Sequence, residues 1–205
     1  MKLKFKIQQY QTDAVDSVVN VFKGQPNQAN LSYRMDKGKV YVVDSKTHNS
    51  KMVQTTLTYD DDGLGYKNNR LVIDGLSLFD NIHQVQTENN IHLDEELCCK
   101  LGACQLDVEM ETGTGKTYVY IKTMFELNKH YGWTKFIVVV PSVAIREGVK
   151  KSFDITVDHF MEQYGKKARY FIYDSSSLND IDTFSQSNDI SVMIINTQAF
   201  NTMKE

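Results

Sequence analysis

The chain has 205 residues, of which 41% are hydrophobic and 24% are charged, as in an ordinary globular protein rather than a disordered one. Its 23 lysines and arginines against 26 aspartates and glutamates give a net charge of -3, which excludes a global basic field, so any contact with nucleic acid must be local. The crowded, odd-numbered cysteines Cys98, Cys99 and Cys104 indicate reduced thiols, and the lack of a signal peptide or membrane-length apolar run predicts a cytoplasmic chain without membrane contact.

The first predicted element is a helix over residues 12–22. Gly24 and Pro26 follow it as stop signals. Its apolar residues recur at helical spacing: Ala14, Val15, Val18, Val19 and Phe22. The pattern therefore predicts an amphipathic helix with one buried face.

Between Gly24 and Gln105 the sequence becomes polar and rich in turn residues. Three short β-branched runs lie in it, "KVYVVD", "MVQTTLTYD" and "RLVIDG", with "DDDGLG" and "KNN" between the last two. Runs of this length, bounded by turn signals, are typical of hairpins. The sequence therefore predicts a small β-rich module, which carries no motif of known function.

From Leu106 onward, predicted strands alternate with helices. A strand leads into "ETGTGKT", a helix then runs to Tyr131 with Gly132 as its cap, and the strand "KFIVVV" follows. A helical stretch and the strands "ARYFIYD" and "ISVMIIN" complete the region. This alternation predicts an α/β fold with a parallel sheet flanked by helices.

The strand expected before the glycine-rich loop has an unusual pattern. Its sequence "QLDVEME" alternates apolar residues with acidic ones, whereas a central parallel strand is usually apolar on both faces. Glu109 and Glu111 are also unfavourable near a polyphosphate. Either carboxylate is therefore expected to turn away from a bound nucleotide.

Residues 110–117, "METGTGKT", match the Walker A pattern except that Met110 replaces the first glycine. Gly113 and Gly115 allow turns that aim backbone N–H groups at a phosphate, and the following helix adds its positive end. Lys116 reaches the β and γ oxygens, and the Thr117 hydroxyl can hold Mg²⁺. The pattern predicts nucleotide binding by the following residues, with catalytic roles for the last two: Thr112, Gly113, Thr114, Gly115, Lys116 and Thr117.

This loop resembles that of superfamily 2 helicases and translocases, and two further segments narrow the resemblance. "QQYQTDAVDSVVNVF" is similar to the adenine-recognition motif of these enzymes, with Gln11 in the place of its glutamine. "VVVPSVAIREGV" and "MIINTQAFN" are similar to the DNA-contacting motifs Ia and Ib in the Res subunit of type III restriction-modification enzymes. The sequence thus resembles the N-terminal part of a Res subunit.

The resemblance implies a division of the chain into three parts. Residues 1–23 form the adenine-recognition helix, residues 24–104 an inserted β-rich module, and residues 105–205 an incomplete first RecA-like lobe that stops before the Walker B motif. Because Walker B and the second lobe supply part of the catalytic apparatus, the chain alone is expected to bind ATP weakly and to lack turnover. The inserted module is either an insertion without a binding role, which we favour, or a docking surface for the methyltransferase subunit.

The resemblance also implies ligands and partners. They are ATP with Mg²⁺, double-stranded DNA and a methyltransferase (Mod) subunit. Pro141, Ser142 and Thr197 are expected to contact the DNA backbone, which positions a motor without reading sequence.

Each of these residues has a structural alternative. Gln11 alone could be a solvated helix residue, Pro141 and Ser142 a turn and cap, and Thr197 the start of a helix. Two other functions also remain open. One is the motor of a type I restriction enzyme or a repair helicase, and the other is a nucleotide-dependent binding protein without turnover.

Overall fold

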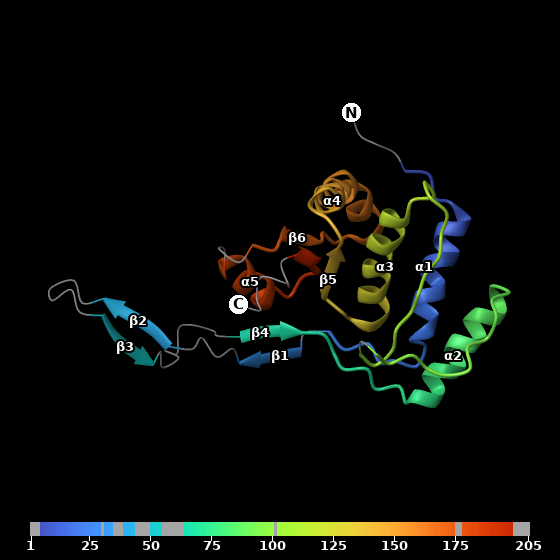
Figure 1. Ribbon diagram of the computed structural model, residues 1–205, viewed down its shortest axis with the longest axis horizontal. Helices are drawn as coiled ribbons and strands as arrows, with labels where there is room; N and C mark the ends of the chain where they lie inside the picture. Colours follow the sequence, from blue (N-terminus) through green and yellow to red (C-terminus); the bar gives the residue numbers. More distant parts are fainter. Residues whose placement is uncertain are drawn as a thin grey trace.

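The computed structural model describes residues 5–29, 31–34, 39–43, 50–54, 64–100, 102–174 and 178–198, and it confirms the expected α/β architecture (Figure 1). Its elements follow in chain order: α1 (Gln9–Val21), β1 (Leu31–Arg34), β2 (Lys39–Val43), β3 (Ser50–Gln54), β4 (Leu64–Lys67), α2 (Gly75–Glu88), α3 (Lys116–Tyr131), β5 (Lys135–Val140), α4 (Val143–Tyr164), β6 (Arg169–Ile172), α5 (Leu178–Gln186) and β7 (Ser191–Asn196).

A three-stranded parallel sheet lies at the centre of the α/β part, in the order β5-β7-β6. The register pairs Val140 of β5 with Asn196 of β7, so these two strands end together. The middle strand β7 is buried along nearly its whole length, as a strand with neighbours on both sides requires. The apolar runs predicted as strands therefore form the sheet.

Helices α3 and α4 pack on one face of this sheet. Their shared core centres on Ile121, Phe153, Phe160, Val192 and Ile194, all at most 2% exposed. The rings of Phe125 and Phe160 stack with centroids 4.8 Å apart. This core fixes the start of α3, and hence the glycine-rich loop before it, relative to the sheet.

Helix α1 packs against the other side of α3, as Figure 1 shows. Val15 and Val19 of α1 contact Val119 and Leu127 of α3, so the predicted apolar stripe is indeed the buried one. The Tyr131 hydroxyl donates a 2.7 Å hydrogen bond to the Val19 carbonyl. These contacts hold α1 beside the helix that follows the loop.

Gly132 ends α3 as the sequence predicted. It takes a left-handed conformation, with φ 75°, and its N–H donates to the Asn128 carbonyl at 2.9 Å. An added Cβ would lie 2.7 Å from the Ala29 backbone nitrogen. Glycine is thus required here both by the backbone conformation and by the close approach of the chain that leaves α1.

The segment from Gly24 to Gln105 contains two antiparallel strand pairs, β1 with β4 and β2 with β3, which are separate from the parallel sheet. It also contains helix α2, which the sequence analysis did not predict. The side chain of Asp74 caps this helix by accepting from the N–H groups of Leu76 and Ser77, both at 3.0 Å. The Asp-Gly pair there is a helix start and not a turn.

The strand predicted at "RLVIDG" is wrong, since residues 70–74 form no strand. The Gln25 side chain bonds to this segment where a neighbouring strand would otherwise pair with it. It donates to the Arg70 carbonyl at 2.8 Å and accepts from the Val72 N–H at 2.9 Å. Asn69, which is buried, accepts a further bond from Gln25 at 2.9 Å. These bonds satisfy the Arg70 carbonyl and the Val72 N–H, and residues 70–74 follow an irregular path toward α2.

The strand predicted in front of the glycine-rich loop is also wrong. Residues 105–111 follow an irregular path and are not part of the parallel sheet. Asp107 and Glu109 are exposed, whereas a position inside the sheet would bury them without partners. Leu106 and Met110 are half-buried against the helices instead.

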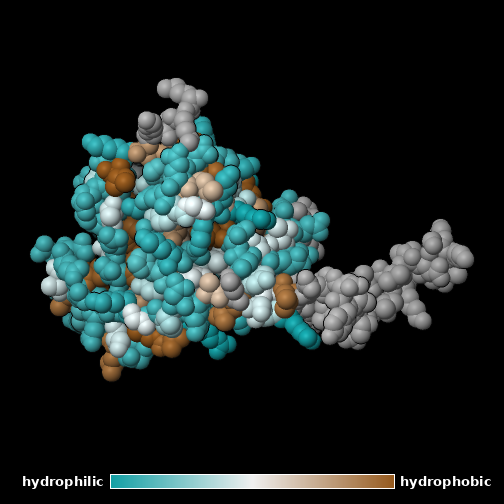
Figure 2. Space-filling view, turned by 180° about the vertical axis from the view of Figure 1, so that it is seen from behind, coloured by the Kyte–Doolittle hydropathy of each residue, from teal (hydrophilic) through white to brown (hydrophobic). Residues whose placement is uncertain are grey.

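The surface is mixed in character. Figure 2, which shows the molecule from behind, has apolar residues in patches between polar ones. None of the helices in the described parts of the chain is long and apolar enough to cross a membrane.

Candidate nucleotide-binding site

The glycine-rich loop has the backbone shape that phosphate binding requires. Gly113 and Gly115 have φ 84° and 90°, a left-handed region that residues with a side chain avoid. Helix α3 begins directly after Gly115, and no side chain caps its first turn. The uncapped N–H groups and the positive helix end are suited to an anion.

Lys116, the predicted phosphate-binding lysine, folds back over the loop. Its exposed ammonium group donates to the Met110 carbonyl. The Thr114 hydroxyl donates to the Glu111 carbonyl at 2.7 Å and closes the loop on itself. Among the described residues the ammonium group bonds to a neutral carbonyl, and a phosphate oxygen is a stronger acceptor.

The structure brings Gln11 to the loop although 103 residues separate it from Thr114. Its Nε2 donates a 2.8 Å hydrogen bond to the Thr114 carbonyl, and the Tyr10 hydroxyl donates to the same oxygen at 3.3 Å. The packing of α1 on α3 makes this contact possible. Gln11 is thus not a freely solvated helix residue.

The close approach of Gln11 also explains the second loop glycine. A Cβ on Gly115 would lie 2.6 Å from Gln11 Nε2, well inside van der Waals contact. The contact between the loop and α1 therefore leaves no room for a side chain at position 115.

The two remaining threonines predicted at the site differ in exposure. Thr112 is exposed in the loop, and Thr117 is half-buried in the first turn of α3.

An aromatic cluster that the sequence analysis missed lies beside the loop. Phe5 stacks on Tyr118, with ring centroids 5.9 Å apart, and also contacts His159 of α4 at 5.0 Å. The Tyr118 hydroxyl and His159 Nε2 are hydrogen-bonded at 2.9 Å. Burial lowers the pKa of His159, nearby Lys122 adds to this effect, and Glu162 opposes it. The cluster ties the chain before α1 to the helix after the loop.

The predicted DNA-contacting residues converge at one edge of the sheet. Pro141 and Ser142 follow β5, Thr197 follows β7, and the two strands are paired neighbours. Thr197 Oγ1 lies 3.5 Å from the Pro141 carbonyl oxygen. Ser142 also caps α4, because its Oγ accepts from the Ile145 N–H at 3.3 Å. The helix cap, which was the structural alternative for Ser142, is therefore confirmed.

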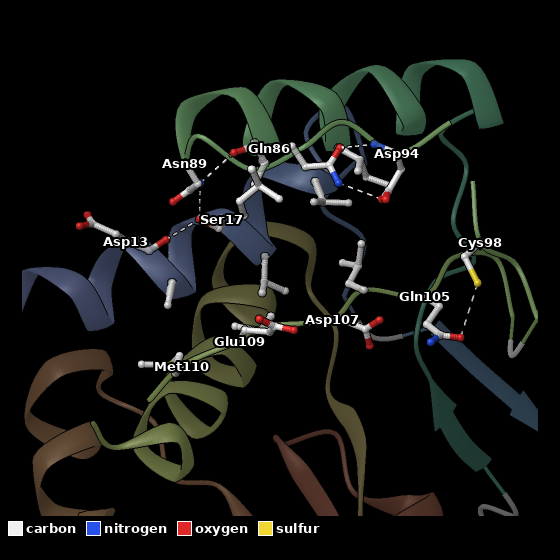
Figure 3. Close-up of a pocket in the computed structure, with 18 of the residues that line it drawn as sticks. Asp13, Ser17, Gln86, Asn89, Asp94, Cys98, Gln105, Asp107, Glu109 and Met110 are labelled. Carbon is white, nitrogen blue, oxygen red and sulfur yellow. Dashed lines mark hydrogen bonds between the residues drawn. The ribbon is translucent and has the colours of Figure 1, made fainter. Parts of the chain in front are cut away.

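Acidic side chains surround one side of the loop. Asp107, Glu109 and Glu111 are all exposed on the segment that leads to it. They line a pocket between this segment, α1 and α2 (Figure 3). These carboxylates repel a phosphate on their side of the loop, whereas the N–H groups at the start of α3 attract one on the other side.

Comparison with known proteins identifies the family of the chain. Residues 4–205 match the family described as "Type III restriction enzyme, res subunit". Over 100 residues, 47% of the chain, it is 41% identical to the EcoP15I Res subunit of Escherichia coli and 38% identical to the EcoPI Res subunit of Escherichia phage P1. Over 61 residues it is 51% identical to the StyLTI Res subunit of Salmonella typhimurium.

These matched segments cover 10%, 10% and 6% of the three relatives, so the match spans a tenth or less of the length of the curated proteins. The match to the family, in contrast, covers nearly the whole chain. The chain therefore belongs to the family of type III restriction enzyme Res subunits.

Proposed function

We propose that this chain is the ATP-binding part of the motor lobe of a DNA translocase, within an enzyme that couples ATP hydrolysis to DNA translocation and cleavage. The observation that carries the proposal is the contact of Gln11 with the phosphate loop, through the 2.8 Å hydrogen bond to Thr114. It places a side-chain amide, which can recognise a base, beside a loop suited to phosphates. Residues 1–23 and 105–205 would act together in this site.

The loop residues have distinct roles in this proposal. Backbone N–H groups from Thr112 to Thr117 hold the phosphates, and Lys116 exchanges the Met110 carbonyl for a phosphate oxygen. Mg²⁺, when bound, neutralises charge that develops on the phosphates, and the Thr117 hydroxyl would help to hold it. Gln11 has both a donor and an acceptor, as discrimination of adenine from guanine requires.

Binding of the nucleotide is tested by titrating the chain with ATP and GTP in the presence of Mg²⁺. ATP is expected to bind more tightly than GTP, and ATP binding is expected to weaken in Lys116→Ala. Equal affinities for the two nucleotides would contradict the assigned role of Gln11. A comparable affinity in Lys116→Ala would contradict the site itself.

We further propose that double-stranded DNA passes over Pro141, Ser142 and Thr197, and that site recognition belongs to a methyltransferase partner. The supporting observation is that the ends of β5 and β7 bring the three residues together. Contacts to phosphates from such positions orient a motor on the duplex. The segment from residue 24 to 104 is proposed as an insertion outside this path.

A single substitution separates the two roles of Ser142. Aspartate caps a helix as well as serine does, so Ser142→Asp is expected to leave the unfolding midpoint unchanged or slightly raised. Its charge would repel a DNA phosphate and weaken DNA binding. Asn188→Asp, which adds the same charge at an exposed position before β7, serves as the control. Unchanged DNA affinity in Ser142→Asp would remove this residue from the proposed DNA path.

A further inference from the structure

The Tyr120 hydroxyl is a buried polar group without a hydrogen-bond partner. Its oxygen is shielded from solvent, and none of the described residues bonds to it. The ring of Tyr120, early in α3, packs against the core that α3 and α4 share with the sheet. A buried hydroxyl left unpaired costs stability, because it loses its bonds to water and gains none in return. Phenylalanine would fill the same space without this cost, so packing alone does not explain the hydroxyl.

The position of Tyr120 on α3 directs its side chain toward the phosphate loop. Side chains in a helix lean toward its amino end, so that each residue covers the turn before its own. Three residues before Tyr120, on the same face of α3, lies Thr117 in the turn that directly follows the loop. The Thr117 side chain is half-buried. The two hydroxyl groups are thus neighbours across one helical turn.

The pKa of Tyr120 is sensitive to this neighbour. Burial raises the pKa of the Tyr120 hydroxyl, and an interaction with the Thr117 hydroxyl, which favours the ionised form, opposes the rise. The two groups do not meet hydrogen-bond geometry, since the Tyr120 oxygen has no partner in the described part of the chain. The two hydroxyls are therefore close but unbonded.

The proposed role of Thr117 requires an acceptor for its proton. A threonine that holds Mg²⁺ does so through an oxygen lone pair, and its single O–H must then point elsewhere. Thr123, on the same helix, donates to the Val119 carbonyl four residues back at 2.9 Å. For Thr117 the residue four back is Gly113, which lies in the loop before the helix, and the described structure has no such bond there. The unpaired Tyr120 oxygen is an acceptor within reach of one turn.

We propose that Tyr120 is a positioning residue of the nucleotide site: its hydroxyl oxygen accepts the proton of the Thr117 hydroxyl and so turns the Thr117 lone pairs toward Mg²⁺. The inference rests on the proposed function, because it requires that Thr117 holds the metal of a metal–nucleotide complex. It gives the buried Tyr120 hydroxyl a partner in the bound state. Tyr120 acts through Thr117 and need not touch the nucleotide.

Removal of one oxygen atom tests the proposal. ATP is titrated by calorimetry into the original chain, Tyr120→Phe and Tyr131→Phe, with Mg²⁺ and with EDTA. Tyr131→Phe is the matched control, because it removes the same atom at the other end of α3, where the hydroxyl bonds to the Val19 carbonyl. Tyr120→Phe is expected to weaken binding of ATP with Mg²⁺ by about two- to ten-fold and to leave binding in EDTA unchanged. Tyr131→Phe is expected to change neither.

A double-mutant cycle shows whether Tyr120 acts through Thr117. Thr117→Val removes the hydroxyl and keeps the β-branched shape. In this background Tyr120→Phe is expected to have no further effect on the affinity for ATP with Mg²⁺. Thr117→Ser, which keeps a hydroxyl, is expected to preserve the effect of Tyr120→Phe. A full additional loss in the Thr117→Val background would show that Tyr120 acts by another route, and would overturn the proposal.

Stability separates a positioning role from a structural one. In urea unfolding without nucleotide, Tyr120→Phe is expected to be as stable as the original chain or more so, because an unpaired buried hydroxyl is removed. A clear loss of stability would mean that the hydroxyl holds the fold together, and would overturn the proposal. Mg²⁺-dependent ATP binding that Tyr120→Phe leaves unchanged would also overturn it, with the proposed function intact. Absence of ATP binding by the original chain would instead overturn both.

Discussion

Gly115→Ala tests the fit between α1 and the phosphate loop. The residue has φ 90° and ψ 36°, where an alanine costs about 1–2 kcal/mol relative to its favoured conformation. The added Cβ would lie 2.6 Å from Gln11 Nε2, so the Gln11 side chain must move away. Its hydrogen bond to the Thr114 carbonyl is then lost, at a further cost of about 0.5–1.5 kcal/mol.

The expected destabilisation is therefore about 2–3 kcal/mol, which lowers the unfolding midpoint by roughly 4–12 °C for a chain of this size. Thermal and urea unfolding, followed by circular dichroism, measure it. Gly148→Ala is the matched control, because Gly148 is exposed within α4 and its Cβ would meet nothing within 4 Å. There alanine is expected to stabilise the chain by about 0.5–1 kcal/mol. A Gly115→Ala variant as stable as the original would refute the reasoning.

Three further substitutions have defined outcomes. Gln11→Ala is expected to weaken ATP binding by on the order of 1–3 kcal/mol while GTP binding changes little; calorimetric titration of both nucleotides checks this, and equal losses would make Gln11 purely structural. Tyr131→Phe removes the buried hydrogen bond to the Val19 carbonyl and should lower the free energy of unfolding by about 1 kcal/mol in urea, whereas no loss would mean that the bond contributes nothing. Burial lowers the pKa of Lys135 from 10.5 to about 8, although Asp189 opposes the shift. The unfolded chain therefore binds more protons than the folded chain between about pH 8 and 10.5. As a result, the contribution of this lysine to the free energy of unfolding rises with pH through that range. Unfolding measured at pH 7.5 and pH 10 should therefore show the original chain gaining stability relative to Lys135→Met, and a constant difference would contradict the shift.

The regular elements were predictable where one apolar pattern decides the structure. The stripe of Val15 and Val19 predicted α1, and the apolar runs of β5 and β7 predicted the sheet. Helix α2 was missed because Asp74 and Gly75 have turn chemistry as well as capping chemistry, and only the Asp74 hydrogen bonds distinguish the two. The run at residues 70–74 was misread because a distant side chain, Gln25, takes the place of a neighbouring strand by bonding the Arg70 carbonyl and the Val72 N–H.

The candidate site was predictable in part. Its loop glycines and Lys116 follow from local sequence, since their spacing determines the backbone shape. The contact between Gln11 and Thr114 depends on how α1 packs against α3, which local sequence does not determine. Phe5 joins the aromatic cluster beside the loop by the same kind of long-range contact. No signal in the sequence near Phe5 could have indicated this contact.

The central claim, that the loop beside Gln11 binds a nucleoside triphosphate, is tested most directly by titrating ATP with Mg²⁺ into three forms of the chain. These are the original chain, Lys116→Ala, and Lys151→Ala as an exposed control on α4. Loss of the ammonium group from a charge-assisted hydrogen bond should weaken binding by at least about ten-fold in Lys116→Ala. Lys151→Ala should bind as the original chain does. No binding by the original chain, or equal affinity in all three forms, would contradict the account.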